Sequence, residues 1–166
     1  NMFEGRNSSV GERSMLGVVQ QVAKRIGAER IGYLATFDQM FAGISASLKS
    51  AAQSAILQAE KHLPEPNSEL TILANRLLKA LFLVDSFKAT PRNLAVLVYD
   101  RFGLDLTGLG SQVQEALNLL EAQSYVQRNG NLYEYLTNEE QEIEKEIKAV
   151  DIDSSEVSAK LFRYLN

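Results

Sequence analysis

The spacing of apolar and polar residues predicts two helices before residue 66. Apolar residues between Val18 and Ile26 recur every three or four positions, as they do along one face of an α-helix. Ser9 is followed three residues later by Glu12, a capping-box pattern that favours a helix start nearby. We therefore expect the first helix to cover about residues 11–26.

A second, longer helix is expected from Phe37 to His62. Its apolar residues again lie three or four positions apart, and Pro64 and Pro66 prevent it from continuing. The middle of this stretch is rich in alanine and serine, so a partner helix could approach it closely. The proline-containing segment that follows is the clearest boundary in the chain, and we place a first helical unit at residues 1–66.

Three shorter helices are expected after this boundary. Asn67 or Ser68 can cap the first of them. Thr90 can cap the second, with Pro91 in the first turn, where a missing N–H has no cost. The third helix occupies the stretch between Thr107 and Gln123, whose apolar residues step by three or four.

A short β-hairpin is expected after the third helix. Residues 125–128 and 132–136 alternate in polarity on either side of an Asn-Gly-Asn sequence, and Asn-Gly between two such runs is a strong hairpin signal. Three helices followed by a hairpin is the order of a winged helix, in which the hairpin forms the wing. We therefore predict a winged-helix domain at residues 67–136.

Two C-terminal helices are expected in residues 137–166. Thr137 and Glu140 repeat the capping-box pattern at the start of the first one. A narrow apolar stripe runs along it, by which we expect it to pack, and consists of Ile143, Ile147 and Val150. The last, short helix should bury Val157, Leu161, Phe162 and Leu165. The predicted fold is therefore mainly α, with one small hairpin.

Composition excludes several classes of site. The chain has no cysteine, so a disulfide framework and a thiolate metal site are excluded. With a single histidine, a histidine-based metal cluster would need a second chain to supply the other ligands. We also find no nucleophile with a base beside it, and we predict neither a catalytic residue nor a metal site. No apolar run is long enough to span a membrane and no signal peptide is recognisable, so we expect a cytoplasmic protein without membrane contact.

The formal net charge of −4 comes from the C-terminal part alone. Residues 137–166 hold four basic and eight acidic residues, whereas the two kinds balance in the rest of the chain. No segment has the positive surplus that is typical of a nucleic-acid clamp. A neutral winged helix suits contact with another protein better than contact with DNA.

Double-stranded DNA is the other partner that a winged helix suggests, because its third helix can enter the major groove while the wing follows the backbone. Here the third helix carries amide side chains, but also two glutamates and no lysine or arginine. The candidates for DNA contact are Lys88, Arg92, Gln112, Gln114, Arg128 and Asn129. Tyr133 and Tyr135 share one face of a strand, where they are expected to pack rather than to stack on bases.

Four stretches of the chain carry a resemblance to a known family: "GERSMLGVVQQVAKRIG", "LATFDQMF", "LLKALFLVDSFKATPRNLAVLVYDRF" and "SYVQRNGNLYEYLTNEEQEIEKEI". Together they resemble the large P-loop ATPase of bacteriophage-exclusion (BREX) defence systems, called BrxC or PglY. The resemblance implies an internal or C-terminal fragment of a longer cytoplasmic protein, in which an AAA+-type ATPase core is followed by a helical lid and a winged helix. Residues 1–66 would be the lid-like segment.

The chain lacks the G-x-x-x-x-G-K-[ST] loop with which such an ATPase holds phosphates. We therefore predict that the fragment itself is not an enzyme and holds no cofactor, and that ATP and Mg²⁺ belong to the full-length protein. The resemblance implies a nucleotide-sensing role for Arg13, for which an ordinary solvated arginine is the alternative.

Partners follow from the same resemblance. It implies other BREX subunits, or DNA, to which the winged helix would couple the nucleotide state of the core. The alternative is a stand-alone interaction module that associates with itself through the long helix from Phe37 to His62.

Overall fold

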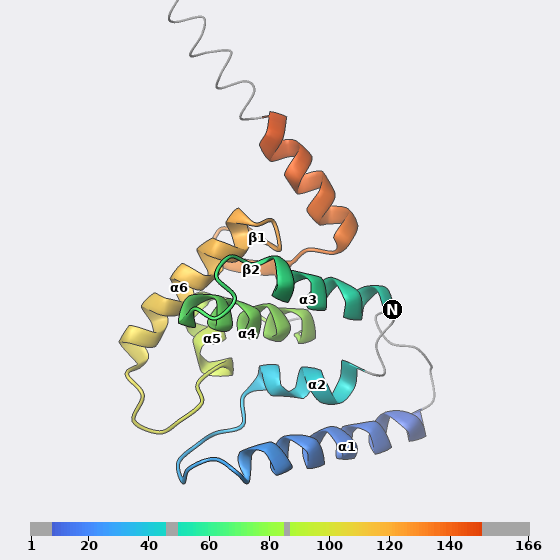
Figure 1. The fold of residues 1–166 in the computed structure, drawn as a ribbon, viewed down its shortest axis with the longest axis vertical. Coiled ribbons are helices and arrows are strands. Elements are labelled where there is room, and N and C mark those ends of the chain that lie inside the picture. The colour runs from blue at the N-terminus through green and yellow to red at the C-terminus, as the bar shows by residue number, and fades with distance from the viewer. Residues whose placement is uncertain (1–7, 46–49, 85–86, 151–166) are drawn as a thin grey trace, which may run out of the picture.

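The computed structural model describes residues 8–45, 50–84 and 87–150, and it is mainly helical, as predicted (Figure 1). Its elements in chain order are α1 (Ser8–Ile26), the short 3₁₀ helix η1 (Phe37–Gln39), α2 (Met40–Ile44), α3 (Ser50–His62), α4 (Glu69–Leu83), α5 (Pro91–Leu97), α6 (Leu106–Ala122), β1 (Val126–Asn129) and β2 (Leu132–Tyr135). A further helix covers residues 138–150.

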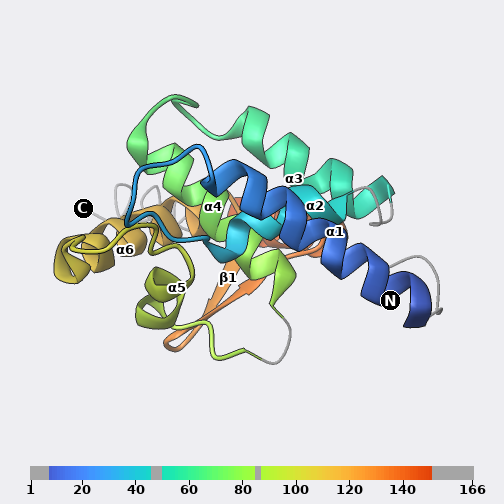
Figure 2. The same ribbon diagram turned by 90° about the horizontal axis from the view of Figure 1, so that it is seen from below.

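Helix α4 is the centre of the fold. It contacts α3, α6, η1, α2 and the hairpin, which surround it in both views (Figures 1 and 2). The ring of Phe82 meets those of Phe41 in α2 and Tyr135 in β2 edge to face, at centroid distances of 5.7 and 5.3 Å. One hydrophobic core therefore includes residues from both sides of the predicted boundary at residue 66.

The helix starts around α4 are fixed by local caps. The side chains of Ser68 and Thr90 each accept a hydrogen bond from the backbone N–H three residues ahead, and Pro91 occupies the first turn of α5. These predicted caps are confirmed. Helix α6 is capped by Asp105, whose carboxylate accepts hydrogen bonds from two backbone N–H groups.

The predicted hairpin is confirmed, with β1 and β2 antiparallel and Asn129 opposite Leu132. The two loop residues are therefore Gly130 and Asn131. Gly130 has φ of +62°, which suits the first loop position of a type II′ turn, where glycine is preferred. The two loop residues thus lie one position later than the Asn129-Gly130 pair from which the hairpin was predicted.

Tyr133 anchors the hairpin to the helices. It is buried, and Tyr135 is half-buried on the same face of β2, as the alternation predicts. The backbone N–H of Tyr133 donates to the carbonyl of Ala89 at 3.0 Å, so the segment before α5 borders β2. The hydroxyl of Tyr133 accepts a hydrogen bond from Gln114 Nε2 of α6 at 2.9 Å. The backbone of Tyr133 thus fixes the edge of the hairpin to the segment before α5, and its side chain fixes one face of the hairpin to α6.

The prediction of one helix from Phe37 to His62 is wrong. Helix α2 ends at Ile44, and Figure 1 shows α3 as a separate helix that runs in the opposite direction. The reversal brings Phe41 and Ile56 onto the same core around α4, which one straight helix of about 39 Å could not do. In this arrangement Ala55 and Ala59 are buried within the chain, so this part of the alanine-rich face is not available for the expected self-association.

Helix α1 begins at Ser8, so Ser9 lies inside its first turn and the predicted cap at Ser9 is wrong. Val18 and Val22 are buried, and α1 packs mainly against α2. The contact is close because Gly43 of α2 lies directly under Val18 and leaves no room for a Cβ. Gly43 thus sets the distance between these two helices.

The helix at residues 138–150 begins with the predicted capping box. A Glu140 carboxylate oxygen accepts from Thr137 N at 2.8 Å, and Thr137 Oγ1 accepts from Glu140 N at 3.4 Å. The prediction that this helix packs by its apolar stripe is wrong, because Ile143, Ile147 and Val150 are 57%, 52% and 66% exposed.

Polar side chains attach this helix instead. Gln141 Nε2 donates to the carbonyl of Leu136 at 2.8 Å. Lys148 Nζ donates to the carbonyl of Glu121 at 2.6 Å and to Ser124 Oγ at 3.0 Å. Since the last carbonyls of α6 have no partner within that helix, a cation beside them is favourable, and Lys148 lies on the face that turns inward. The predicted last helix, in residues 151–166, lies outside the described residues.

Within the described ranges, no helix combines the length and the apolar character that a membrane crossing requires.

Candidate functional site

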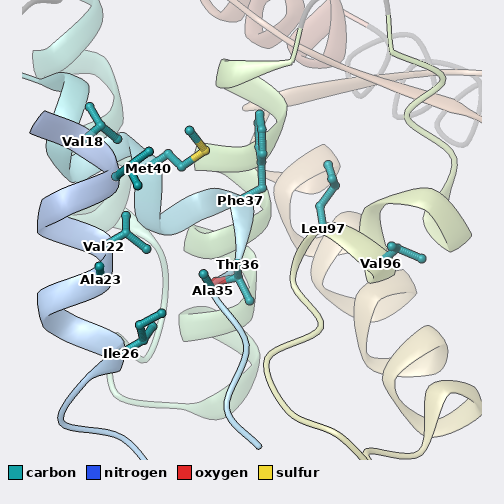
Figure 3. A pocket seen from close by; sticks show the side chains of 11 residues that line it. Val18, Val22, Ala23, Ile26, Ala35, Thr36, Phe37, Met40, Val96 and Leu97 are labelled. Carbon is teal, nitrogen blue, oxygen red and sulfur yellow. The ribbon is translucent and has the colours of Figure 1, made fainter. Parts of the chain in front are cut away.

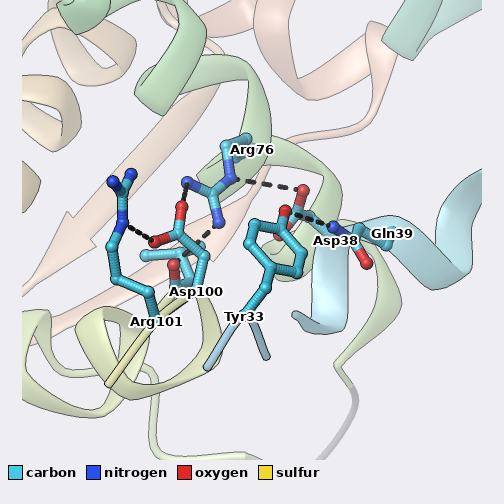
Figure 4. A network of polar contacts seen from close by, with 7 residues as sticks. Tyr33, Asp38, Gln39, Arg76, Asp100 and Arg101 are labelled. Atoms are coloured by element: carbon cyan, nitrogen blue, oxygen red, sulfur yellow. Dashed lines mark hydrogen bonds and ion pairs between the residues drawn. The ribbon is translucent and has the colours of Figure 1, made fainter. Parts of the chain in front are cut away.

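One arginine of α4 joins three parts of the chain (Figure 4). Arg76 Nε lies 3.4 Å from Asp38 Oδ2 in η1, and Nη1 lies 3.2 Å from Asp100 Oδ2 after α5. Nη2 donates to the carbonyl of Val98 at 2.7 Å. The Asp38 and Asp100 side chains are only 10% and 14% exposed, so these charge-assisted bonds are largely shielded from water. We call Arg76, Asp38 and Asp100 the Arg76 joint.

A short backbone bridge reinforces the joint. Leu34 N donates to the carbonyl of Asp100 at 2.7 Å, and Phe102 N donates to the carbonyl of Gly32 at 3.0 Å. Tyr33 and Arg101 are thereby paired as an isolated antiparallel bridge. The segment after α1 and the segment after α5 are thus fixed side by side.

Arg101 is the outer partner of the joint. It is exposed, and its Nε donates to Asp100 Oδ1 at 3.1 Å. This hydrogen bond and the charge of Asp100 raise the pKa of Arg101, which remains a cation. Asp100 therefore holds one arginine on its buried side and one on its solvent side, and the arrangement serves to connect segments rather than to move protons.

The two glutamines proposed to read bases lie on different sides of α6. Gln114 is half-buried, and its Nε2 donates to Tyr133 Oη and to Asn118 Oδ1. Gln112 is exposed, on the side of α6 that borders Arg76 and Arg101. Helix α6 therefore does not present both amides to one groove.

The other candidates for DNA contact, Lys88, Arg92, Arg128 and Asn129, are all exposed. Lys88 precedes Ala89 on one side of β2, and Arg128 pairs with Tyr133 on the other side. Arg128 lies over the Tyr133 ring at 5.9 Å, and its Nε donates to the carbonyl of Gly130. The structure thus brings Lys88 and Arg128 to the two edges of β2. The side chain of Arg13 lies outside the described residues.

An apolar groove runs between α1 and α5, with η1 and α2 as its floor (Figure 3). Its volume is about 420 Å³, and its lining includes Val22, Ile26, Phe37, Met40, Val96 and Leu97. One lining side chain is polar: Thr36, which is 3% exposed and whose Oγ1 has no hydrogen-bond partner among the described residues. We call this cavity the α1–α5 groove.

Sequence reasoning missed both the joint and the groove. The only signal for the joint was a single arginine in the middle of a largely apolar helix, Arg76 in α4. The groove had no separate signal, because the stripe from Val18 to Ile26 reads as an ordinary buried face.

The described part of the chain holds no cluster of three histidine, aspartate or glutamate side chains that could bind a metal ion. No family model matches the chain, and no solved structure matches it.

Proposed function

We propose that this chain is the non-catalytic coupling part of a cytoplasmic phage-defence ATPase of the BrxC or PglY kind. In this proposal, residues 67–136 form a winged helix, and the lid-like helical segment before them passes movements of an ATPase core to it. ATP and Mg²⁺ would be bound by that core. The proposal is supported by the resemblance of four stretches of sequence and by one structural observation, the Arg76 joint.

The order and packing of the elements support a winged helix. Helices α4, α5 and α6 are followed directly by the hairpin, which is fixed to α6 by Gln114 and Tyr133. The bond from Tyr133 N to the carbonyl of Ala89 adds an extended segment at the edge of β2. The hairpin is therefore a rigid extension of the three helices, as a wing must be.

The Arg76 joint carries the argument for coupling. Arg76 belongs to α4 in the proposed winged helix, whereas Asp38 belongs to the proposed lid-like segment. Separating these groups would leave charges unpaired where water has little access, which is unfavourable. A displacement of η1 would therefore be passed to α4 and, through Asp100, to the loop that leads into α6.

A protein partner fits the surface of α6 better than DNA does. Its exposed positions include Ser111, Gln112, Glu115 and Asn118 and no lysine or arginine. Attraction to phosphates supplies much of the affinity of DNA-binding proteins, and α6 cannot provide it. We therefore propose that other subunits of the defence complex are the partners of this face.

Replacing Arg76 in the full-length gene product tests the proposal. Arg76→Lys keeps the charge but cannot form all three contacts at once, so phage restriction should fall while ATP hydrolysis by the core is retained. Arg101→Lys, at the exposed end of the same joint, is the matched control and should restrict phage normally. Full restriction by a folded Arg76→Lys protein would refute the coupling, and a gene without a phosphate-binding loop upstream of Asn1 would refute the proposed family.

DNA contact through the wing is the second candidate, because Lys88 and Arg128 flank β2. If the wing binds DNA, the triple variant Lys88→Ala, Arg92→Ala, Arg128→Ala should bind a DNA duplex more weakly. The slope of log K against the logarithm of the salt concentration should also become shallower by about 0.9 for each lost phosphate contact. Replacing three exposed cations elsewhere, Lys24, Arg30 and Lys61, is the control of equal charge. Equal binding by the two triple variants would exclude the wing as a DNA site.

A further inference from the structure

The α1–α5 groove has apolar rims and a positive border. Val19 on α1 and Val96 on α5 line it and are 53% and 64% exposed. Over residues 15–26 and 91–97, these two helices carry no acidic side chain and three basic ones, Lys24, Arg25 and Arg92, of which Lys24 lies on the face of α1 away from the groove. Arg92 lies one turn before Val96, on the same side of α5. The groove therefore suits an apolar segment with acidic flanks.

The helix at residues 138–150 has this character. Its exposed stripe of Ile143, Ile147 and Val150 follows an i, i+4, i+7 spacing, so the three side chains lie on one face. Five glutamates and two lysines accompany the stripe in this helix. Gln141 and Lys148, which attach the helix to the body, lie on nearly the opposite face, because each residue advances about 100° around the axis. The apolar stripe thus points away from its own chain.

The two surfaces lie at opposite ends of the molecule. Figure 1, which has the longest axis vertical, shows α1 at the bottom and the helix at residues 138–150 projecting from the top. With the described residues in this arrangement, the helix cannot enter the groove of its own chain. A second copy can supply it.

We propose that this protein associates with itself head to tail, with the helix at residues 138–150 of one copy bound in the α1–α5 groove of the next. The stripe enters the apolar cavity, and the glutamates face Arg25 and Arg92. Such a contact joins two different surfaces, so a pair keeps one free groove on one copy and one free helix on the other, and longer chains or a closed ring follow. This inference does not depend on the proposed role in phage defence.

Complementation between two variants tests the contact. Val96→Glu places an acid in the groove, and Ile147→Glu places one in the stripe, and both sites are exposed in the single chain. Each variant alone should be monomeric in sedimentation experiments, with the dissociation constant raised about tenfold or more. Mixed in equal amounts they should form a one-to-one complex, because one variant keeps an intact helix and the other an intact groove.

Leu57 of α3 provides the control, because it is 43% exposed and lies outside both surfaces. Leu57→Glu should associate like the unaltered chain. A single helix in a groove is a small interface, below about 1,200 Å², so sedimentation should extend to about 1 mM protein. Where Val96→Glu fails to fold, as judged by circular dichroism, Val19→Glu replaces it.

Three results would overturn the proposal. The first is an unaltered chain that stays monomeric over the whole concentration range. The second is a pair of folded variants that remains monomeric after mixing, and the third is a variant that still associates alone, since either shows that the helix and the groove are not each other's partners.

Discussion

Val18 of α1 lies so close to Gly43 of α2 that a Cβ at Gly43 would be 2.9 Å from both methyl carbons of Val18 and 3.0 Å from its Cα. Because the backbone of α1 is part of this contact, a side-chain rotation cannot relieve it. The two helices therefore approach each other only because residue 43 has no side chain.

Gly43→Ala should therefore destabilise the protein by about 1–3 kcal/mol, the usual cost of overpacking. Gly17→Ala is the matched control, since a Cβ at this position in α1 meets nothing within 4 Å. There, alanine should stabilise the helix by about 0.5–1 kcal/mol. Urea unfolding of both variants measures the difference, and equal midpoints would contradict the close contact.

Arg76→Ala should cost about 2–4 kcal/mol, because it leaves the largely buried Asp38 without its cation and Asp100 with only the exposed Arg101. Arg101→Ala removes only an exposed pair with Asp100 and should leave the unfolding midpoint almost unchanged. Thermal and urea unfolding distinguish the two. If both variants unfold alike, the joint does not stabilise the fold.

Gln114→Ala should weaken the hairpin by about 1 kcal/mol, because the Tyr133 hydroxyl loses its hydrogen bond from α6. Gln112→Ala, two residues away and exposed, should have little effect. Amide hydrogen exchange of β1 and β2 is the measurement. Unchanged protection in Gln114→Ala would show that Gln114 does not stabilise the hairpin, and its side chain would again be a candidate for contact with a partner.

Stability should fall at alkaline pH because of Tyr135. Burial, with smaller contributions from Glu140 and Glu139, raises the pKa of Tyr135 to about 12. A tyrosine in the unfolded chain ionises near pH 10, so between about pH 10 and 12 the unfolded state loses a proton that the folded state keeps. The free energy of unfolding should therefore decrease as the pH rises through this range.

Tyr135→Phe keeps the ring against Phe82 and removes the ionising group. Its free energy of unfolding should decrease less steeply over the same pH range. Urea unfolding at a series of pH values, together with the absorbance of tyrosinate, measures both proteins. A variant as steep as the unaltered chain would assign the effect to other groups.

Local chemistry made much of the fold predictable. The caps at Ser68, Thr90 and Thr137 depend on residues within one turn of helix, and all three are confirmed. The hairpin and the inward face of Tyr133 and Tyr135 likewise follow from alternation over a few residues.

Long-range contacts made the rest unpredictable from pattern alone. The chain reverses between α2 and α3 because Phe41 and Ile56 both reach one core, and alanine and serine give no local sign of it. The partners of Arg76 come from η1 and from the loop after α5. In the helix at residues 138–150, Lys148 lies on the inner face and donates to the end of α6, a contact that no apolar periodicity can reveal.

The bridge between Tyr33 and Arg101 also bears on how the chain folds. It closes a large loop, and the entropy of closing such a loop must be met before the contact contributes. The bridge should therefore form late, after α4, α5 and α6 have assembled. During synthesis, the segment that follows α1 must wait until the ribosome has released Arg101, so α1 and this segment emerge well before the bridge can form.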